Sequence, residues 1–179
     1  MTIYQTIARL GPKVLPKHKL FKYGFNLSPM YRRSTARITV VSEDLHHVVV
    51  KLPISYRNRN YVGSIFGGSM FSAVDPVPMV QLMNLLGDGY VVWDKSAQIQ
   101  FKVPAKEDLY ADFSYSEEEL NDIVANVNKH QETHIEKLTK LTDETRSQVF
   151  CEVNKTIYIA SKSHYKEKLK RRLNRESTT

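Results

Sequence analysis

Polar residues and glycines interrupt one otherwise apolar stretch of the chain, NYVGSIFGGSMFSAVDP, at residues 60–76. Asn60 precedes the apolar run, Gly67 and Gly68 lie inside it, and Asp75 stands near its end. A helix meant only for burial needs neither an amide nor a carboxylate, because both groups are costly to bury without partners. We therefore interpret this stretch as a candidate site.

The residue types in this stretch suit chemistry at a carbonyl group. The first N–H groups of a helix are free and carry partial positive charge, which stabilises the oxygen of a tetrahedral intermediate. Glycine at such a helix start lets an acyl group approach the backbone closely. A partly desolvated carboxylate nearby can act as a general base. These features favour a site that flanks an acyl carbonyl.

Each residue of the stretch also has a purely structural interpretation. The paired glycines could let a helix pass close under a sheet. Asp75 could cap a second helical piece ahead of Pro76, and Asn60 could close a loop with its side chain. The combined spacing of these residues, rather than any one of them, favours the functional interpretation.

The strands predicted around this stretch alternate apolar and polar residues. Residues 34–54 carry two β-branched runs around a turn at residues 42–44, which predicts a hairpin. Four more strand candidates follow, at residues 90–105, 109–116, 133–143 and 147–161. The periodicity of residues 133–143 also allows a helix, but the turn-prone DET that follows favours a strand. The sequence therefore predicts an α+β fold with about six antiparallel strands.

One buried helix is predicted between the second and third strands, with Ile65, Met70, Ala73 and Val74 facing inward. Pro76 and Pro78 should kink or break this helix, and a second helical piece, VQLMNLLG, should end at Gly87. The candidate carboxylate lies directly before this predicted break.

Three other helices are predicted. Residues 2–11 form a short amphipathic pattern, and residues 117–129 follow a capping box made by Ser116 and Glu119. The second of these helices could form a flap at one edge of the sheet. Residues 164–176 could dock on the body through Tyr165, Leu169 and Leu173. We divide the chain into a basic N-terminal helical segment (1–33), a main domain (34–160) and a basic C-terminal helical tail (161–179).

Composition excludes several classes of protein. The 179 residues are 41% hydrophobic and 25% charged, which is typical of one globular domain. The single cysteine, Cys151, excludes an internal disulfide framework and is expected to be a small core residue. No apolar run is long enough to span a bilayer, and no secretory signal is recognised. We expect a cytoplasmic protein.

The net charge of +7 is concentrated at the two ends of the chain. Residues 1–33 carry about seven basic and no acidic residues, and residues 161–179 carry about seven basic and two acidic residues. Such ends could simply be solvated, or could contact an anionic membrane surface or a phosphorylated ligand. No nucleic-acid partner is expected, because no basic patch is paired with aromatic stacking positions.

The motif and the predicted architecture resemble the hotdog-fold thioesterases, and specifically their PaaI-like and DUF4442 groups. The resemblance covers roughly residues 30–160. Phenylalanine before the paired glycines and proline after the aspartate are typical of the DUF4442 group. The residues that match the spacing of the family motif are Asn60, Gly63, Ser64, Ile65, Phe66, Gly67, Gly68 and Asp75.

The resemblance implies a sheet wrapped around a central helix and an active site at the interface of a homodimer, which could pair again into a dimer of dimers. Asp75 would be the general base or nucleophile that attacks an acyl-CoA or a related acyl thioester. Asn60 would hold the attacking water, and the Gly67 N–H would polarise the carbonyl. A strand alignment also places Asp94 where one related enzyme carries a helper serine. A second carboxylate would then lie near Asp75, although Asp94 could equally be a surface residue of the strand.

The resemblance also implies a substrate-binding wall at the helix start, formed by Phe66, Gly68 and Ser69, with Asp94 contributing from the strand. The phosphates of CoA would need cations at the mouth of the site, for which Arg57, Arg59 and Lys102 are candidates.

Two departures from the motif of the PaaI-like thioesterases leave an alternative function open. Phe66 stands where the related enzymes carry a histidine, and Pro76 and Pro78 should change the backbone beside Asp75. If Asp75 then pointed away from the carbonyl site, the protein could bind an acyl chain or acyl-CoA without hydrolysing it.

Other chemistries lack a motif in this chain. The HQETH sequence at residues 130–134 does not have the order of a metalloprotease motif, so no metal site is predicted. The sequence has no phosphate loop, dinucleotide fingerprint or serine elbow, and we predict no cofactor.

Overall fold

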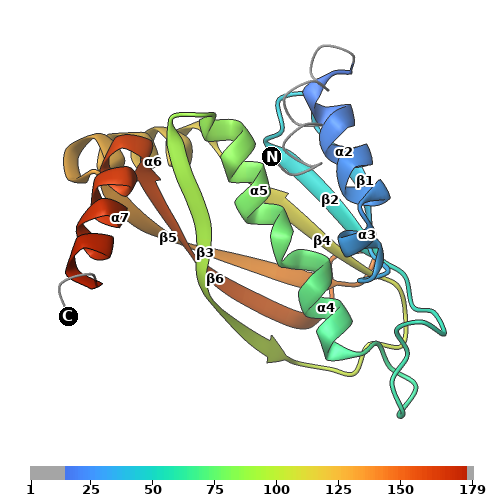
Figure 1. The fold of residues 1–179 in the computed structure, drawn as a ribbon. Helices are drawn as coiled ribbons and strands as arrows, with labels where there is room; N and C mark the ends of the chain where they lie inside the picture. Colours follow the sequence, from blue (N-terminus) through green and yellow to red (C-terminus); the bar gives the residue numbers. More distant parts are fainter. Residues whose placement is uncertain (1–14, 177–179) are drawn as a thin grey trace.

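A six-stranded antiparallel sheet curves around a central helix in the computed structural model of this chain, which describes residues 15–176 (Figure 1). The strands lie in the order β1-β2-β4-β5-β6-β3. Their bounds are β1 (Arg37–Val41), β2 (His47–Leu52), β3 (Tyr90–Phe101), β4 (Leu109–Ser114), β5 (Glu132–Thr142) and β6 (Val149–Ser161). The predicted hairpin is confirmed as β1 and β2, and residues 133–143 form strand rather than helix. The helix predicted at residues 2–11 lies outside the described residues.

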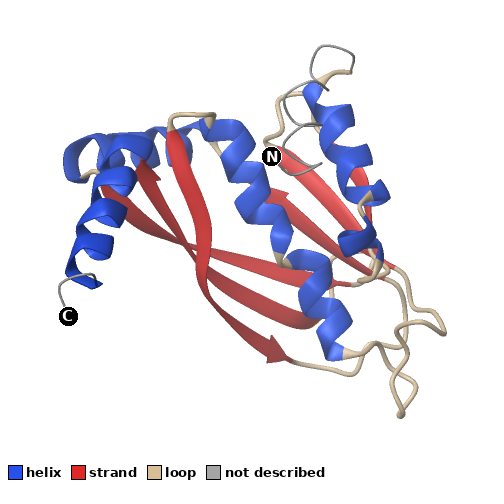
Figure 2. Cartoon of the chain, in the orientation of Figure 1, coloured by secondary structure: helices blue, strands red, loops and turns tan. Residues whose placement is uncertain are grey.

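The central helix consists of α4 (Gly67–Val74) and α5 (Pro76–Leu86), which cross the concave side of the sheet (Figure 2). Asp75 alone separates them and keeps helical dihedral angles, φ −48° and ψ −55°. The predicted break is therefore confined to one residue, and α5 starts at Pro76 because proline fits the first turn of a helix. Ile65, expected inside the helix, instead precedes it and pairs with Arg59 in an isolated bridge.

Side chains from the sheet and from the N-terminal helices reinforce the junction of α4 and α5. Proline has no N–H, so Pro76 and Pro78 each remove a hydrogen bond from the helix. Three side-chain donors reach carbonyl oxygens on both sides of the junction. They are Tyr31 Oη to Ala73 O at 2.8 Å, Lys155 Nζ to Asp75 O at 2.5 Å, and Tyr115 Oη to Pro78 O at 3.0 Å. The junction is therefore held in one geometry.

Two clusters of buried side chains fill the concave side of the sheet. The larger cluster contains Met70 and Val74 of α4 together with Phe21 and Phe25 of α2 (Lys17–Leu27). The short helix α3 (Pro29–Arg32) follows α2. Cys151 is buried in the same cluster, as predicted, and burial raises the pKa of its thiol to about 11.

The second cluster contains Ile123 and Val127 of α6 (Glu117–His130), packed with Leu82 and Ile157. Ser116 Oγ accepts a hydrogen bond from the Glu119 N–H at 3.1 Å. Ser116 therefore caps the start of α6, as predicted. Because its apolar side chains are buried in this core, α6 is part of the body and not a flap.

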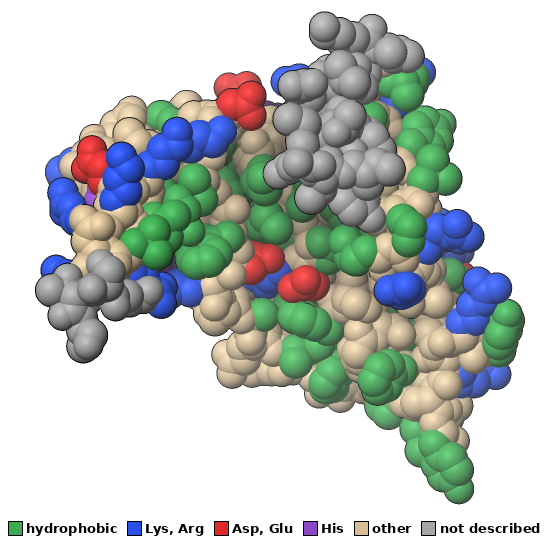
Figure 3. Space-filling view, viewed as in Figure 1, with side chains coloured by type: hydrophobic (Ala, Val, Ile, Leu, Met, Phe, Trp, Pro, Cys, Tyr) green, Lys and Arg blue, Asp and Glu red, His purple; other side chains and the backbone are tan. Residues whose placement is uncertain are grey.

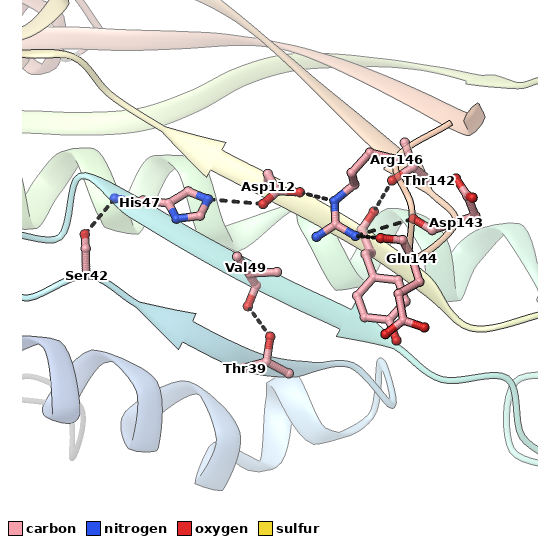
Figure 4. Close-up of polar contacts among 10 residues, drawn as sticks. Thr39, Ser42, His47, Val49, Asp112, Thr142, Asp143, Glu144 and Arg146 are labelled. Atoms are coloured by element: carbon pink, nitrogen blue, oxygen red, sulfur yellow. Dashed lines mark hydrogen bonds and ion pairs between the residues drawn. The ribbon is translucent and has the colours of Figure 1, made fainter. Parts of the chain in front are cut away.

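The pairing of β4 with β5 depends partly on side-chain contacts. Only one pair, Tyr110 and Thr142, is in register between these strands. The turn after β5 is tied back to β4 by Arg146, whose Nε donates to Asp112 Oδ2 at 2.5 Å (Figure 4). The other carboxylate oxygen of Asp112 lies 3.1 Å from His47 Nε2 on β2. This network connects three segments where the backbone ladder is short.

The C-terminal helix α7 (Lys162–Glu176) packs against the outer face of the sheet through Tyr165. The Tyr165 ring lies 6.2 Å from Trp93 and 6.4 Å from Tyr158. Leu169 and Leu173, which were predicted to dock with it, remain 47% and 56% exposed. Within residues 15–176, α7 and the other helices are all too short or too polar to cross a bilayer.

Glu132 anchors α7 to the sheet, and this contact should make the stability of the fold sensitive to acid. Its carboxylate accepts from Lys168 Nζ at 2.6 Å and from Tyr158 Oη at 2.5 Å, and these bonds lower its pKa to about 2. The stabilisation is present above the unfolded-state pKa, about 4.3, and is lost as the pH falls toward 2.

Glu132→Gln should therefore lower the free energy of unfolding at pH 7 by about 1 kcal/mol and should weaken its decline between pH 5 and 3. Chemical denaturation at several pH values measures both effects. Glu136→Gln is the matched control, because Glu136 lies on the same strand and bonds the neutral side chains of Asn154 and Thr156. Equal acid sensitivity in wild type and Glu132→Gln would show that the anchor does not titrate.

Candidate functional site

The start of α4 exposes backbone N–H groups. Phe66 occupies the N-cap position and makes no capping hydrogen bond with its side chain. Its carbonyl accepts from the N–H groups of Ser69 at 2.9 Å and Met70 at 3.2 Å. In the described part of the chain no acceptor bonds the N–H groups of Gly67 and Gly68, which point out of the first turn. A helix start of this kind can bind a negatively charged oxygen.

Aromatic rings lie directly against both glycines. A Cβ atom at Gly67 would lie 2.6 Å from the Phe101 ring of β3, and one at Gly68 would lie 2.4 Å from the Phe66 ring. A side chain at either position would therefore have to displace one of these rings, both of which are exposed. The two rings are 57% and 58% exposed and form an apolar wall beside the free N–H groups.

Asn60 uses its side chain to close the loop before α4. Its Oδ1 accepts from the N–H groups of Val62 and Ser64, both at 3.1 Å, and its Nδ2 donates to Ser64 Oγ at 2.9 Å. The interpretation that Asn60 closes a loop with its side chain is therefore confirmed. The side-chain amide nitrogen carries two N–H groups, and within residues 15–176 only one of them has an acceptor, Ser64 Oγ. The second N–H group can therefore bind a water or a ligand.

Asp75 lies at the junction of α4 and α5 and is paired with Lys155 of β6. Lys155 Nζ lies 2.8 Å from Asp75 Oδ1 and 2.5 Å from Asp94 Oδ2 of β3. The Asp75 side chain is 41% exposed, whereas that of Lys155 is 1% exposed. The cap interpretation of Asp75 does not hold, because its side chain makes no capping bond to α5. The structure thus brings Asp75 and Asp94 together through a buried lysine.

Asp94 is the more buried of the two carboxylates. Burial raises its pKa, the hydrogen bond and charge of Lys155 oppose that rise, and the negative charge of Asp75 adds to it. Its Oδ1 atom is buried and has no hydrogen-bond partner among the described residues. Two carboxyl groups therefore share one ammonium group at the centre of the site.

The two parts of the candidate site are separated within one chain. Asp75 follows Gly67 by eight residues, which corresponds to roughly 12 Å along a helix. A carbonyl bonded to the Gly67 N–H has its carbon about 4 Å from that nitrogen, and a nucleophile must approach to about 3–3.5 Å. The helix start and the carboxylate of one chain are thus too far apart for direct attack on the same carbonyl.

Strand β3 connects these two parts. Its C-terminal residue Phe101 packs on Gly67, and Asp94, the fifth of its twelve residues, reaches Lys155 and, through it, Asp75. Because β3 is the last strand in the sheet order, one of its edges has no neighbouring strand among residues 15–176. Acidic side chains are exposed among apolar ones in the middle of the face formed by α5 and β3 (Figure 3).

The comparisons with known proteins agree with this architecture. A sequence profile described as a domain of unknown function, DUF4442, matches residues 17–159. The chain belongs to the DUF4442 family. A search of curated proteins found no match.

Solved structures similar to this DUF4442 protein include several thioesterases. A protein from Pseudomonas aeruginosa, described as a probable thioesterase of unknown function, has a TM-score of 0.71 and 21% identity over 82% of this chain and 97% of its own. A thioesterase from Haemophilus influenzae gives 0.59 and 11%, covering 81% and 91%. Zebrafish thioesterase superfamily member 2 gives 0.55 and 14%, covering 79% and 96%. At these identities the likeness establishes the hotdog fold.

The cations suggested for a phosphorylated carrier differ in their availability in this DUF4442 protein. Lys102 is paired with Glu152 at 2.9 Å. Arg57 and Arg59 are exposed in the loop before α4, and the Arg57 guanidinium lies 5.5 Å from the centre of the Tyr56 ring. The loop arginines therefore remain the better candidates.

Features away from the motif offer no alternative centre. A cleft of about 300 Å³ lies between α6 and β5 and is lined by Glu118, Glu119 and Asp122, which would repel an anionic ligand. Within residues 15–176, no group of three or more His, Cys, Asp or Glu side chains could hold a metal ion. Of the HQETH residues, Glu132 bonds the α7 side chains and His134 Nε2 lies 3.2 Å from Lys95 Nζ.

Proposed function

We propose that this DUF4442 protein is a homodimeric thioesterase that hydrolyses acyl-CoA or a related acyl thioester. The observation that carries the proposal is that the uncapped start of α4 and the Asp75 carboxylate are connected to two separate residues of the same edge strand, the first to Phe101 and the second, through Lys155, to Asp94. Each is half of a site for hydrolysis, and a second copy would supply the missing half.

A two-fold dimer through β3 would complete the site. The free edge of a twelve-residue strand is a template for pairing with another strand. If two copies pair antiparallel with the two-fold axis midway between Asp94 and Phe101, Phe101 of one copy lies beside Asp94 of the other. Gly67 of one subunit would then approach Asp75 of its partner. Two such dimers could pair again, as hotdog dimers are expected to do.

The proposed reaction uses Asp75 as a base. Its carboxylate removes a proton from water, and the resulting hydroxide adds to the thioester carbonyl carbon. The carbonyl oxygen becomes an oxyanion that accepts a hydrogen bond from the Gly67 N–H, while Asn60 orients the water. The carbon–sulfur bond then breaks, and the thiolate takes the proton from Asp75. Direct attack by Asp75, with an anhydride hydrolysed by water afterwards, is the alternative route to the same products.

The surroundings of the helix start suit an acyl chain and an anionic carrier. Phe66 and Phe101 would form an apolar wall for the acyl group, with Gly68 and Ser69 beside it. Arg57 and Arg59 would meet the phosphates of the carrier. The basic helix α7, which lies on the outer face of the sheet, could contact an anionic membrane that supplies the substrate.

Release of free thiol from a panel of short, medium, long and aromatic acyl-CoAs tests the proposal. The expected result is turnover with at least one chain length. The alternative function, acyl binding without hydrolysis, predicts no turnover but a higher melting temperature in the presence of acyl-CoA. Phe66, which replaces the histidine of the related enzymes, favours that alternative, whereas Asp75 keeps helical geometry beside Pro76. The melting measurement therefore accompanies the assay.

A further inference from the structure

Lys155 is a buried charged residue among the apolar residues of β6. The side chains of β6 that face the central helix form a buried row in which lysine is the only charged member, and the row is Cys151, Val153, Lys155, Ile157 and Ile159. Burying an ammonium group is costly, and well-packed apolar residues often replace a buried ion pair without loss of stability. The bond from Lys155 to Asp75 O supports the junction of α4 and α5, but it does not by itself explain why the same group also bonds two carboxylates.

The ammonium group of Lys155 donates its hydrogen bonds to Asp75 and Asp94. A lysine has three N–H donors, and Nζ reaches Asp75 O at 2.5 Å, Asp75 Oδ1 at 2.8 Å and Asp94 Oδ2 at 2.5 Å. One atom thus binds both the backbone and the carboxylate of Asp75. The Asp75 side chain stays 41% exposed, so it is fixed from the buried side and remains accessible from the other.

Asp94 holds Lys155 from the edge strand. It accepts from Nζ with Oδ2, while its Oδ1 is buried without a partner in the described part of the chain. The Tyr115 phenol lies beside this ion cluster, and its pKa is raised by burial and by the negative charges of Glu119 and Asp94. Lys137, the partner of Glu119, lies 4.0 Å from the centre of the Tyr115 ring. The orientation of Asp75 is therefore coupled to the position of β3, the strand proposed to carry the dimer contact.

We infer that Lys155 is a positioning residue that holds the Asp75 carboxylate at the reaction centre, with Asp94 fixing Lys155 from β3. This inference rests on the proposed thioesterase function. It assigns no bond-making step to Lys155, because its side chain is 1% exposed and does not reach a substrate.

Lys155→Met tests the inference by kinetics. The expected result is a fall in kcat of about 100-fold with KM changed by less than about twofold, because a small misplacement of a reacting group lowers the rate more than it lowers binding. Lys155→Arg retains the charge and donors and should recover part of kcat. The double variant Lys155→Met, Asp94→Asn removes the unpaired buried charge, so it should fold even if the single variant does not, and it should show the same low kcat.

Lys137→Met is the matched control. Lys137 also donates to a carboxylate and a backbone carbonyl, Glu119 at 2.9 Å and Ser114 O at 2.8 Å. It lies over the Tyr115 ring but bonds neither Asp75 nor Asp94. Its substitution should leave kcat unchanged. A carboxyl ¹³C titration provides a readout independent of hydrolysis. Loss of Lys155 should move the Asp94 midpoint to higher pH, and loss of Lys137 should not.

The outcomes separate the two proposals. An active wild type whose kcat is unchanged in folded Lys155→Met would overturn the positioning role alone. An unchanged Asp94 midpoint in Lys155→Met would also overturn it, because the ion cluster would not exist in solution. A wild type that releases no thiol from any acyl-CoA would overturn the thioesterase function, and the positioning role with it.

Discussion

Asp75→Asn is expected to lower kcat for thioester hydrolysis by roughly 10²–10⁴-fold, the usual contribution of a general base. Asparagine has the same shape as aspartate, and its side-chain oxygen can still accept from Lys155 Nζ, so the junction of α4 and α5 should keep its geometry. Substrate binding should be retained. Thiol release at saturating acyl-CoA measures the first effect, and the ligand-induced rise in melting temperature measures the second.

Asp112→Asn provides a stringent control for this variant. The Asp112 side chain is 41% exposed, as is that of Asp75, and it is also paired with a cation, Arg146. It lies on β4 in a network that joins the strands and not at the proposed site (Figure 4). Its substitution should leave kcat unchanged. Full activity of Asp75→Asn would exclude both the base and the nucleophile roles.

Gly67→Pro should lower kcat by about 10²–10³-fold, as the loss of one oxyanion donor does in other enzymes. Gly67 is the first residue of α4, where proline is well tolerated, and the preceding residue Phe66 has the extended conformation, ψ 130°, that proline requires before it. The substitution therefore deletes one N–H group with little change to the helix. Steady-state kinetics with acyl-CoA measure the loss.

Gly67→Ala separates the missing N–H from the added side chain. Both variants place a Cβ where it would meet the Phe101 ring, but that ring is exposed and can move aside. Alanine keeps the N–H group, so its loss of kcat should be much smaller than that of proline. Equal losses in the two variants would attribute the effect to crowding and would contradict the oxyanion role.

The sequence predicted the architecture well where local patterns were sufficient. Runs of β-branched residues, alternation of apolar residues and turn signals together located all six strands, and the Ser116 capping box located the start of α6. The position of α6 could not be predicted, because burial of Ile123 and Val127 depends on Leu82 and Ile157, which are distant in sequence. The prolines misled the prediction of α5, since proline breaks a helix interior but suits a first turn.

The site was only partly predictable for the same reason. Spacing placed Gly67 at a helix start and Asp75 near the helix end, and both positions follow from local structure. Lys155 was missed, because its partners Asp75 and Asp94 are 80 and 61 residues away in the chain. One signal was available in the sequence, since Lys155 occupies an inward position in the alternating apolar row of β6.

Mixing two inactive variants tests the central claim, a site shared between two subunits. In a dimer of Asp75→Asn with Gly67→Pro, one site carries both substitutions and the other carries neither. Random association of equal amounts makes half of the dimers mixed, so activity should return to about a quarter of the wild-type value. Activity that stays at the level of the separate variants, in a mixture shown to contain mixed dimers, would contradict the shared site.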